Sequence, residues 1–122
     1  MLMIDDFLNK MIYFFPNIKI DMNERMEDDF EGLDTIVVEE IIMPEVIELL
    51  KKNTDEKKLN EIFNFFEEVC INSDAYLSNV FSITALEILG NEKNTLETAK
   101  KYMGPVTIKL QREADLSIGR QV

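Results

Sequence analysis

A stripe of apolar side chains at helical spacing is the feature that most constrains the fold. Within residues 54–70 the apolar positions recur at offsets of three and four, which places them on one face of an α-helix. They are Leu59, Ile62, Phe63, Phe66, Val69 and Cys70. Polar residues occupy the other face, so this segment predicts an amphipathic helix with one buried side. Thr54 is a suitable residue to cap its N-terminus.

Residues that end helices divide the rest of the chain into segments of the same kind. Proline lacks the backbone donor that a helix interior needs, and glycine readily adopts the conformation that follows a last turn. Such signals stand at Pro16, Gly32, Asn53, Gly90 and Gly104-Pro105. The pattern predicts helices over residues 2–15, 17–32, 34–53, 54–70, 74–89, 94–103 and 106–116. The apolar residues of the last helix are Val106, Leu110, Ala114 and Leu116.

The segment 34–53 contains two features that could contradict a helix. Residues 35–38 are rich in β-branched side chains, which favour a strand. No second strand-like segment exists to pair with them, so we interpret the whole segment as helical. Pro44 lies in its interior, and we expect it to kink the helix or divide it in two, because its ring clashes with the preceding turn.

Together these segments predict an all-α fold. A chain of 122 residues can form its own hydrophobic core, burying roughly two-thirds of the surface that the unfolded chain exposes. We therefore expect a single helical domain over residues 1–122, an irregular compact bundle of six to seven short helices. The alternative architecture is a short solenoid of stacked helical pairs.

Negative charge is concentrated in one part of the chain. The formal net charge is −11, and residues 21–50 alone hold 11 acidic side chains and one basic one. Residues 51–68 are nearly balanced, with their charges on the polar face of an amphipathic helix. An acidic surface repels phosphate backbones and anionic lipid, so the charge predicts either a basic protein partner or only a solvated face.

The residues that the chain lacks exclude several kinds of active site. With no histidine and one cysteine, Cys70, it cannot form a Ser-His-Asp or Cys-His triad or a credible zinc site. Its four glycines are too scattered for a phosphate-binding loop. An EF-hand alignment that starts at Asp21 places Arg25 and Gly32 where calcium ligands belong. We therefore predict no enzyme activity, no metal and no cofactor.

Targeting and nucleic-acid-binding patterns are also missing from the sequence. The N-terminus has no basic start followed by an apolar run, and no apolar segment is long enough to cross a bilayer. No basic patch carries the interleaved aromatic residues that bind DNA or RNA. Cys70 lies on an apolar stripe, as a small buried hydrophobe in a reducing compartment would. We expect a cytoplasmic protein that binds neither nucleic acid nor membrane.

Glu87 is a carboxylate that the helical pattern places on a buried arc. On the wheel of its helix it falls between Val80 and Ile83. A buried carboxylate is costly unless it is paired. We therefore predict that Glu87 is partly buried and bonded to Arg112, Arg120 or a tyrosine hydroxyl as a structural clasp. The alternative is that it reaches water near the end of the helix.

Short motifs in the second half resemble a known kind of domain. They are Asn79-Val80, Ala85-Leu86-Glu87-Ile88-Leu89-Gly90, Tyr102-Met103-Gly104-Pro105 followed by Thr107, and Gly119-Arg120. Over about residues 60–120 the chain is similar to a family of small, largely uncharacterised bacterial helical domains. The resemblance implies a helical fold and a role as an immunity protein of a toxin system. It does not include the acidic first half.

Charge, size and the resemblance together favour a protein-binding function. The leading hypothesis is a cytoplasmic immunity or antitoxin-like protein that neutralises a basic toxin domain, for example a nuclease. Its predicted partner-binding residues are Glu27, Asp28, Asp29, Glu31, Asp34, Glu39 and Glu40. The alternative is a regulatory or adaptor domain, with no toxin partner, that docks through Met22, Met26 and Phe30. An enzyme acting through carboxylates and a divalent ion is a third hypothesis.

Overall fold

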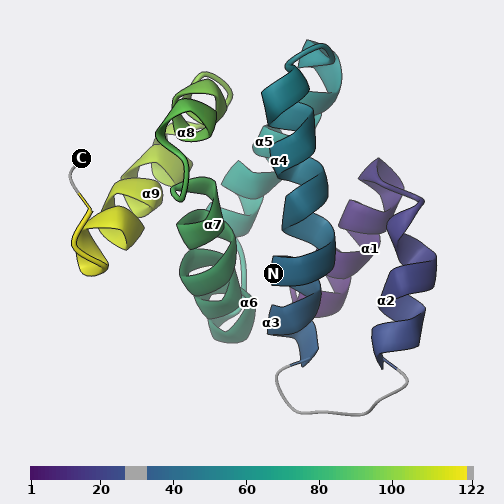
Figure 1. Cartoon of the computed structure of the whole chain (residues 1–122). Coiled ribbons are helices and arrows are strands. Elements are labelled where there is room, and N and C mark those ends of the chain that lie inside the picture. Colours follow the sequence, from purple (N-terminus) through teal and green to yellow (C-terminus); the bar gives the residue numbers. More distant parts are fainter. Residues whose placement is uncertain (27–32, 121–122) are drawn as a thin grey trace.

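Seven helices make up the described part of the chain. The structure is a computed structural model and describes residues 1–26 and 33–120. Within these residues it has seven continuous helices and no strand, which confirms the predicted compact all-α fold (Figure 1). Two of the helices include a π-helical turn, labelled η. The segments are α1 (Ile4–Phe14), α2 (Ile18–Met26), α3 (Leu33–Val37), η1 (Val38–Ile42), α4 (Met43–Lys52), α5 (Glu56–Ile71), α6 (Ala75–Val80), η2 (Phe81–Leu86), α7 (Glu87–Leu89), α8 (Lys93–Lys100) and α9 (Pro105–Ser117).

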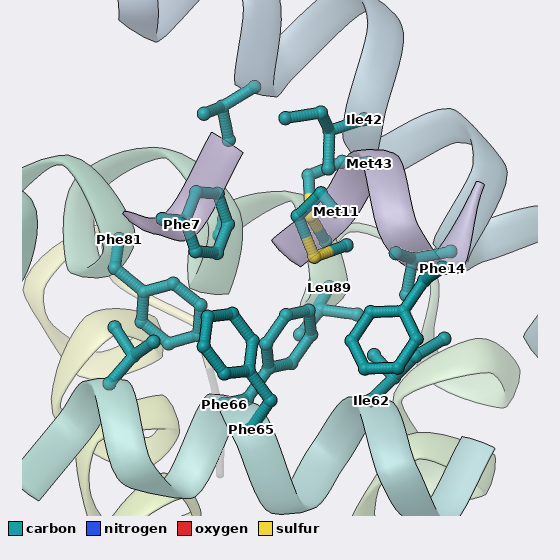
Figure 2. Packing of buried hydrophobic residues seen from close by; sticks show 14 of the residues in the cluster. Phe7, Met11, Phe14, Ile42, Met43, Ile62, Phe65, Phe66, Phe81 and Leu89 are labelled. Carbon is teal, nitrogen blue, oxygen red and sulfur yellow. The ribbon is translucent and has the colours of Figure 1, made fainter. Parts of the chain in front are cut away.

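Aromatic rings from three of these segments form the centre of the core. Phe7 of α1 is buried against Phe65 and Phe66 of α5, with ring centroids 5.9 and 6.4 Å away. Its ring also meets the edge of Phe81 of η2, at 6.0 Å. Figure 2 shows Met11 of α1 beside these rings. Each aromatic pair adds about 0.5–1.5 kcal/mol beyond its buried area, so the cluster holds α1, α5 and η2 together.

The π turns η1 and η2 keep two buried stripes on one face of their helices. In both helices buried residues recur every four positions. They are Val38, Ile42, Val46 and Leu50 in the first helix, and Leu77, Phe81, Ala85 and Leu89 in the second. An α-helix has about 3.6 residues per turn, so a four-residue stripe drifts around its surface. A π turn takes up an additional residue and returns the stripe to the buried side.

These two π turns are in contact. Because η1 contacts η2 and α4 contacts α7, the α3–η1–α4 and α6–η2–α7 helices lie side by side (Figure 1). In η1 the Met43 amide donates to the carbonyl of Val38, five residues earlier. Pro44 follows at the start of α4, where its ring would collide with the carbonyl of Glu40 in a regular α-helix. The helix therefore continues through a widened turn, and the predicted division in two is wrong. A kink at Pro44 stays a prediction.

Of the N-caps predicted for α5 and α6, the first is wrong and the second is confirmed. The N-cap of α5 is Asp55, whose carboxylate accepts a hydrogen bond from the Lys58 amide at 3.1 Å. Thr54 was the predicted cap, but it lies outside the helix, and Asp and Thr are both favoured at this position. The predicted cap of α6 is confirmed, because the Asp74 carboxylate accepts from the Leu77 amide at 2.8 Å.

The boundaries around α8 and α9 also correct the prediction. Asn53 ends α4 with a left-handed φ of 45°, as its position predicted. Helix α8 begins at Lys93 and ends at Lys100, before the predicted stop. Gly104 is the N-cap of α9, and Pro105 lies in its first turn. Proline is favoured there because the amide that it lacks would have no partner within the helix.

Helix α9 turns a polar stripe toward the core. Thr107, Gln111 and Asp115 lie one turn apart and are 0%, 0% and 2% exposed. Leu116, one of the predicted apolar positions, is 53% exposed. The apolar pattern therefore predicted the helix but not its buried side. Buried polar groups need hydrogen-bond partners, which for α9 must come from the neighbouring helices.

Removing the N-cap of α5 tests the corrected helix start. Asp55→Ala leaves the Lys58 amide without its acceptor, and we expect the free energy of unfolding to fall by about 1 kcal/mol. Thr54→Ala, the matched control, should change it by less than about 0.5 kcal/mol. Urea titrations followed by circular dichroism measure both. A larger loss in Thr54→Ala would place the cap at Thr54 after all.

Candidate functional site

The acidic residues predicted to bind a partner occupy different environments. Outside the described residues lie Glu27, Asp28, Asp29 and Glu31. Asp34, in the first turn of α3, accepts a hydrogen bond from the Tyr76 hydroxyl of α6 at 2.8 Å. This bond, with partial burial and the negative charge of Asp34, raises the pKa of Tyr76. Asp34 therefore joins α3 to α6.

Glu39 and Glu40, both exposed, lie on η1. Glu40 forms an ion pair with Arg25 of α2, with 2.7 Å between nitrogen and oxygen. Glu39 has no ion-pair partner among the described residues, and it lines a hollow against η2. Met22, the first residue of the alternative docking stripe, is 2% exposed and belongs to the core. It is therefore not accessible to a partner.

The Glu87 carboxylate does not form the predicted ion pair with an arginine. Arg120 reaches the half-buried Glu87, but its guanidinium donates to the backbone carbonyl of Glu87, at 3.1 Å. Its ion-pair partner is Asp115, at 2.9 Å, and Arg112 is exposed. Among the described residues the Glu87 carboxylate has no ion pair, so the predicted pair is corrected to Asp115–Arg120. The predicted partial burial of Glu87 is confirmed, and only its predicted partner is wrong.

Asp115 and Arg120 belong to a polar cluster between α9 and the end of α7. Arg120 also donates to the side-chain oxygen of Asn91. The Gln111 amide donates to the Leu86 carbonyl at 2.8 Å and to the Asp115 carboxylate at 3.1 Å. These donors meet the C-terminal end of a helix, where free carbonyls and the helix dipole favour positive charge. The cluster therefore fixes the C-terminal half of α9 to α7.

Glu67 of α5 holds the other end of α9. Its carboxylate accepts from the Val106 amide at 3.0 Å, and from the Thr107 amide and hydroxyl, both at 2.7 Å. These amides belong to the first turn of a helix, where they have no intrahelical partner. Burial by itself would raise the pKa of Glu67, but the three hydrogen bonds outweigh it and the pKa lies below its usual value.

Gly90 and Gly104 leave the space that these clusters occupy. A β-carbon on Gly90 would collide with Asp115 and Arg120, and one on Gly104 would collide with the Glu67 carboxylate. Gly104 has an ordinary φ of −76°, so space and not backbone conformation requires a glycine there. The two glycines thus permit the close approach of α9 to α7 and α5.

Residues of the motifs that carry the family resemblance belong to the two polar clusters, one around Asp115 and Arg120 and the other around Glu67. They contribute Gly90, Gly104, Thr107 and Arg120. The interpretation of these motifs as helix stops did not identify their partners, which are Glu67, Gln111 and Asp115. The one available signal was the four-residue spacing of Thr107, Gln111 and Asp115, which predicts a shared helical face. These motifs therefore have a structural explanation.

Cys70 is not placed for nucleophilic chemistry. It is partly buried against the core, with its sulfur 3.5 Å from the Thr107 hydroxyl oxygen. Burial, together with the negative charge of Glu67, raises the pKa of the Cys70 thiol despite the contact with Thr107. The thiol therefore stays protonated at neutral pH.

An acidic and partly apolar groove is the candidate functional site. It lies along η2 and α7, between η1 on one side and the end of α9 on the other. One hollow, of about 460 Å³, is lined by Glu39, Ile83, Thr84, Glu87, Ile88, Asn91, Ile118 and Arg120. A second, of about 200 Å³, shares Ile88 and Asn91 and adds Pro44, Ile47, Glu92 and Thr95. We call the two together the isoleucine groove.

Neither a metal-binding cluster nor a membrane-spanning helix is found among the described residues. Residues 1–26 and 33–120 contain no cluster of three acidic, histidine or cysteine side chains that could hold a metal ion. None of the helices in that part of the chain is long and apolar enough to span a bilayer. A concave surface with apolar side chains and a few charges is typical of a binding site.

The fold and the groove define a small all-α domain with an acidic, partly apolar groove. A family model described as Domain of unknown function (DUF7674) matches residues 8–117, so the chain belongs to this family. The family model also covers the first half of the chain, whereas the resemblance inferred from sequence motifs covered only about residues 60–120. No curated protein and no solved structure matches the chain.

Glu67 makes stability depend on pH in a defined direction. Its pKa is lowered in the folded protein, so folding releases protons near the usual pKa of a glutamate. The stabilisation is fully present above the pKa of the unfolded chain and is lost as the pH falls through the lower folded pKa. Glu67→Gln should cost about 1–2 kcal/mol at pH 7 and should flatten the loss of stability below about pH 5.

Urea unfolding between about pH 3 and 7 measures this effect. Glu68→Gln is the matched control, because it removes the neighbouring, exposed carboxylate of the same helix. It should leave stability at neutral pH within about 0.5 kcal/mol of the wild type. A Glu67→Gln variant with wild-type stability and a wild-type acid slope would show that Glu67 does not cap α9.

Proposed function

We propose that this chain is a protein-binding domain for a basic partner and acts as an immunity or antitoxin-like protein that neutralises a toxin domain. The observation that carries the proposal is the isoleucine groove. It places Ile83 and Ile118, 54% and 47% exposed, beside the carboxylates of Glu39 and Glu87. Stable interfaces combine apolar anchors with a polar rim, and the groove supplies both.

The surface next to the groove carries the charge that would attract such a partner. Helix α2 contacts η1, and these two segments present exposed carboxylates at Asp21, Glu24, Glu39 and Glu40. Arg25 is the one basic residue of the acidic segment 21–50. Opposite charge speeds the encounter of two proteins and disfavours wrong partners. An acidic patch that leads into an apolar groove would therefore favour a basic protein.

Neutralisation would follow from covering the partner's cationic surface. A nuclease toxin binds phosphate backbones through lysine and arginine side chains. A protein with a net charge of −11 can compete for the same side chains. The motifs around Gly90, Gly104 and Arg120 resemble those of a family of small bacterial helical domains. The immunity role that this resemblance implies is the support for a toxin as the partner. A regulatory or adaptor role would use the groove with a different basic protein.

Charge reversal tests the proposal. The full chain and its Glu39→Lys/Glu40→Lys variant serve as baits in the native cell, and captured proteins are identified by mass spectrometry. We expect the wild type to retain a basic toxin domain, and the variant to bind it with an association rate lowered about tenfold at low salt. The purified partner should lose its toxic activity when the wild-type chain is added.

The matched control for this experiment has the same net charge. Glu61→Lys/Glu113→Lys reverses two exposed carboxylates on α5 and α9 and should bind like the wild type. A captured partner that is acidic, or one that binds all three baits equally, would reject the proposal. A basic partner without toxic activity would support the regulatory alternative.

A further inference from the structure

The isoleucine groove contains a contiguous apolar strip. Ile83 of η2 and Ile118, just after α9, line the same hollow. Ile88 belongs to both hollows, and Ile47 extends the strip into the second. Single exposed isoleucines are ordinary on protein surfaces. A set of them in a concave surface is typical of a site that receives an apolar side chain.

The charge that the groove offers to a ligand is negative. Glu39 from η1 and Glu87 from α7 line the hollow, and neither has an ion-pair partner among the described residues. Arg120, the cation on the opposite wall, is already paired with Asp115 at 2.9 Å. A cationic ligand in this hollow would therefore be close to two carboxylates without ion pairs and to one arginine that is already paired.

The spacing of the apolar and acidic groups limits the shape of that ligand. Ile83 and Glu87 are four residues apart on one helix and line one hollow. On an α-helix such side chains are about 5–6 Å apart between β-carbons. Ile83 lies in the π turn η2, so the hollow that both residues line is what shows them to be neighbours here. A ligand that contacts both must hold an apolar group and a cation at a similar distance. Residues three or four apart on a partner helix meet this requirement.

We propose that the isoleucine groove binds a helical segment of a basic protein. An aliphatic side chain of that segment packs against Ile83 and Ile118, and a lysine or arginine three or four residues away binds Glu39 or Glu87. The inference rests on the proposed function and specifies the part of the partner that is recognised. The position of the groove supports it, because both π turns line it and such turns recur at functional sites.

A displayed library of random peptides tests the inference with the full chain as the target. Enriched peptides should pair an aliphatic residue with Arg or Lys at a spacing of three or four. They should bind Ile83→Asp at least about tenfold more weakly than the wild type. Ile71→Asp is the matched control, since Ile71 is 66% exposed at the end of α5 and does not line the groove. Circular dichroism confirms that each variant is folded.

A second variant tests the charge without altering the apolar strip. Glu87→Lys should weaken an enriched peptide about tenfold, and should have little effect on the same peptide with its basic residue replaced by glutamine. Failure to enrich any peptide, enrichment without the aliphatic–basic pair, or binding to Ile83→Asp and Glu87→Lys that is as tight as to the wild type would overturn the inference.

The results also separate this inference from the proposed function. A basic partner whose binding depends on Glu39 and Glu40 but not on Ile83 would reject the helical segment in the groove and leave the proposed function standing. Peptides that depend on Ile83, together with no basic partner in the cell, would reject the function and leave the groove standing.

Discussion

Polar contacts fix α9 to the rest of the molecule, and the candidate site depends on them. Glu67 holds its first turn, while Arg120 and Asp115 join its C-terminal end to α7. Ile118 lies between Asp115 and Arg120 in the chain, so this pair positions one wall of the isoleucine groove. A carboxylate that loses water on folding needs hydrogen-bond donors in its place. Glu67, partly buried, accepts three hydrogen bonds, and Asp115, buried, accepts two.

The second constraint is the four-residue spacing of the stripes on the two central helices. It requires more residues per turn than an α-helix provides, and η1 and η2 supply them. The same turns direct Glu39 and Ile83 toward one hollow. The packing that buries the stripes and the geometry of the groove therefore have one cause. The groove combines residues that are far apart in sequence, from Glu39 to Ile118.

The sequence predicts the helices well because their apolar period and their end signals are local properties. The all-α fold and the Asp74 cap follow from such patterns. The Asp55 cap was missed because Thr54 beside it is also a favoured N-cap residue. Glu87 is partly buried as predicted, but its predicted ion pair is wrong, because a helical wheel shows which face a residue lies on and not which group of another segment it meets. Burial of a polar stripe on α9, and the groove itself, depend on contacts between distant segments, which no local pattern contains.

A double-mutant cycle on Asp115 and Arg120 tests most directly whether α9 is held by its polar face. Asp115→Asn, Arg120→Gln and the double variant are compared with the wild type by urea unfolding. Asp115→Asn leaves Arg120 with two other acceptors, the Glu87 carbonyl and Asn91, and should cost less than Arg120→Gln. Arg120→Gln should cost about 3 kcal/mol, because it leaves the buried Asp115 carboxylate without its cation. The double variant should cost little more, giving a coupling energy above about 1 kcal/mol. Additive losses, with a coupling below about 0.3 kcal/mol, would contradict this account.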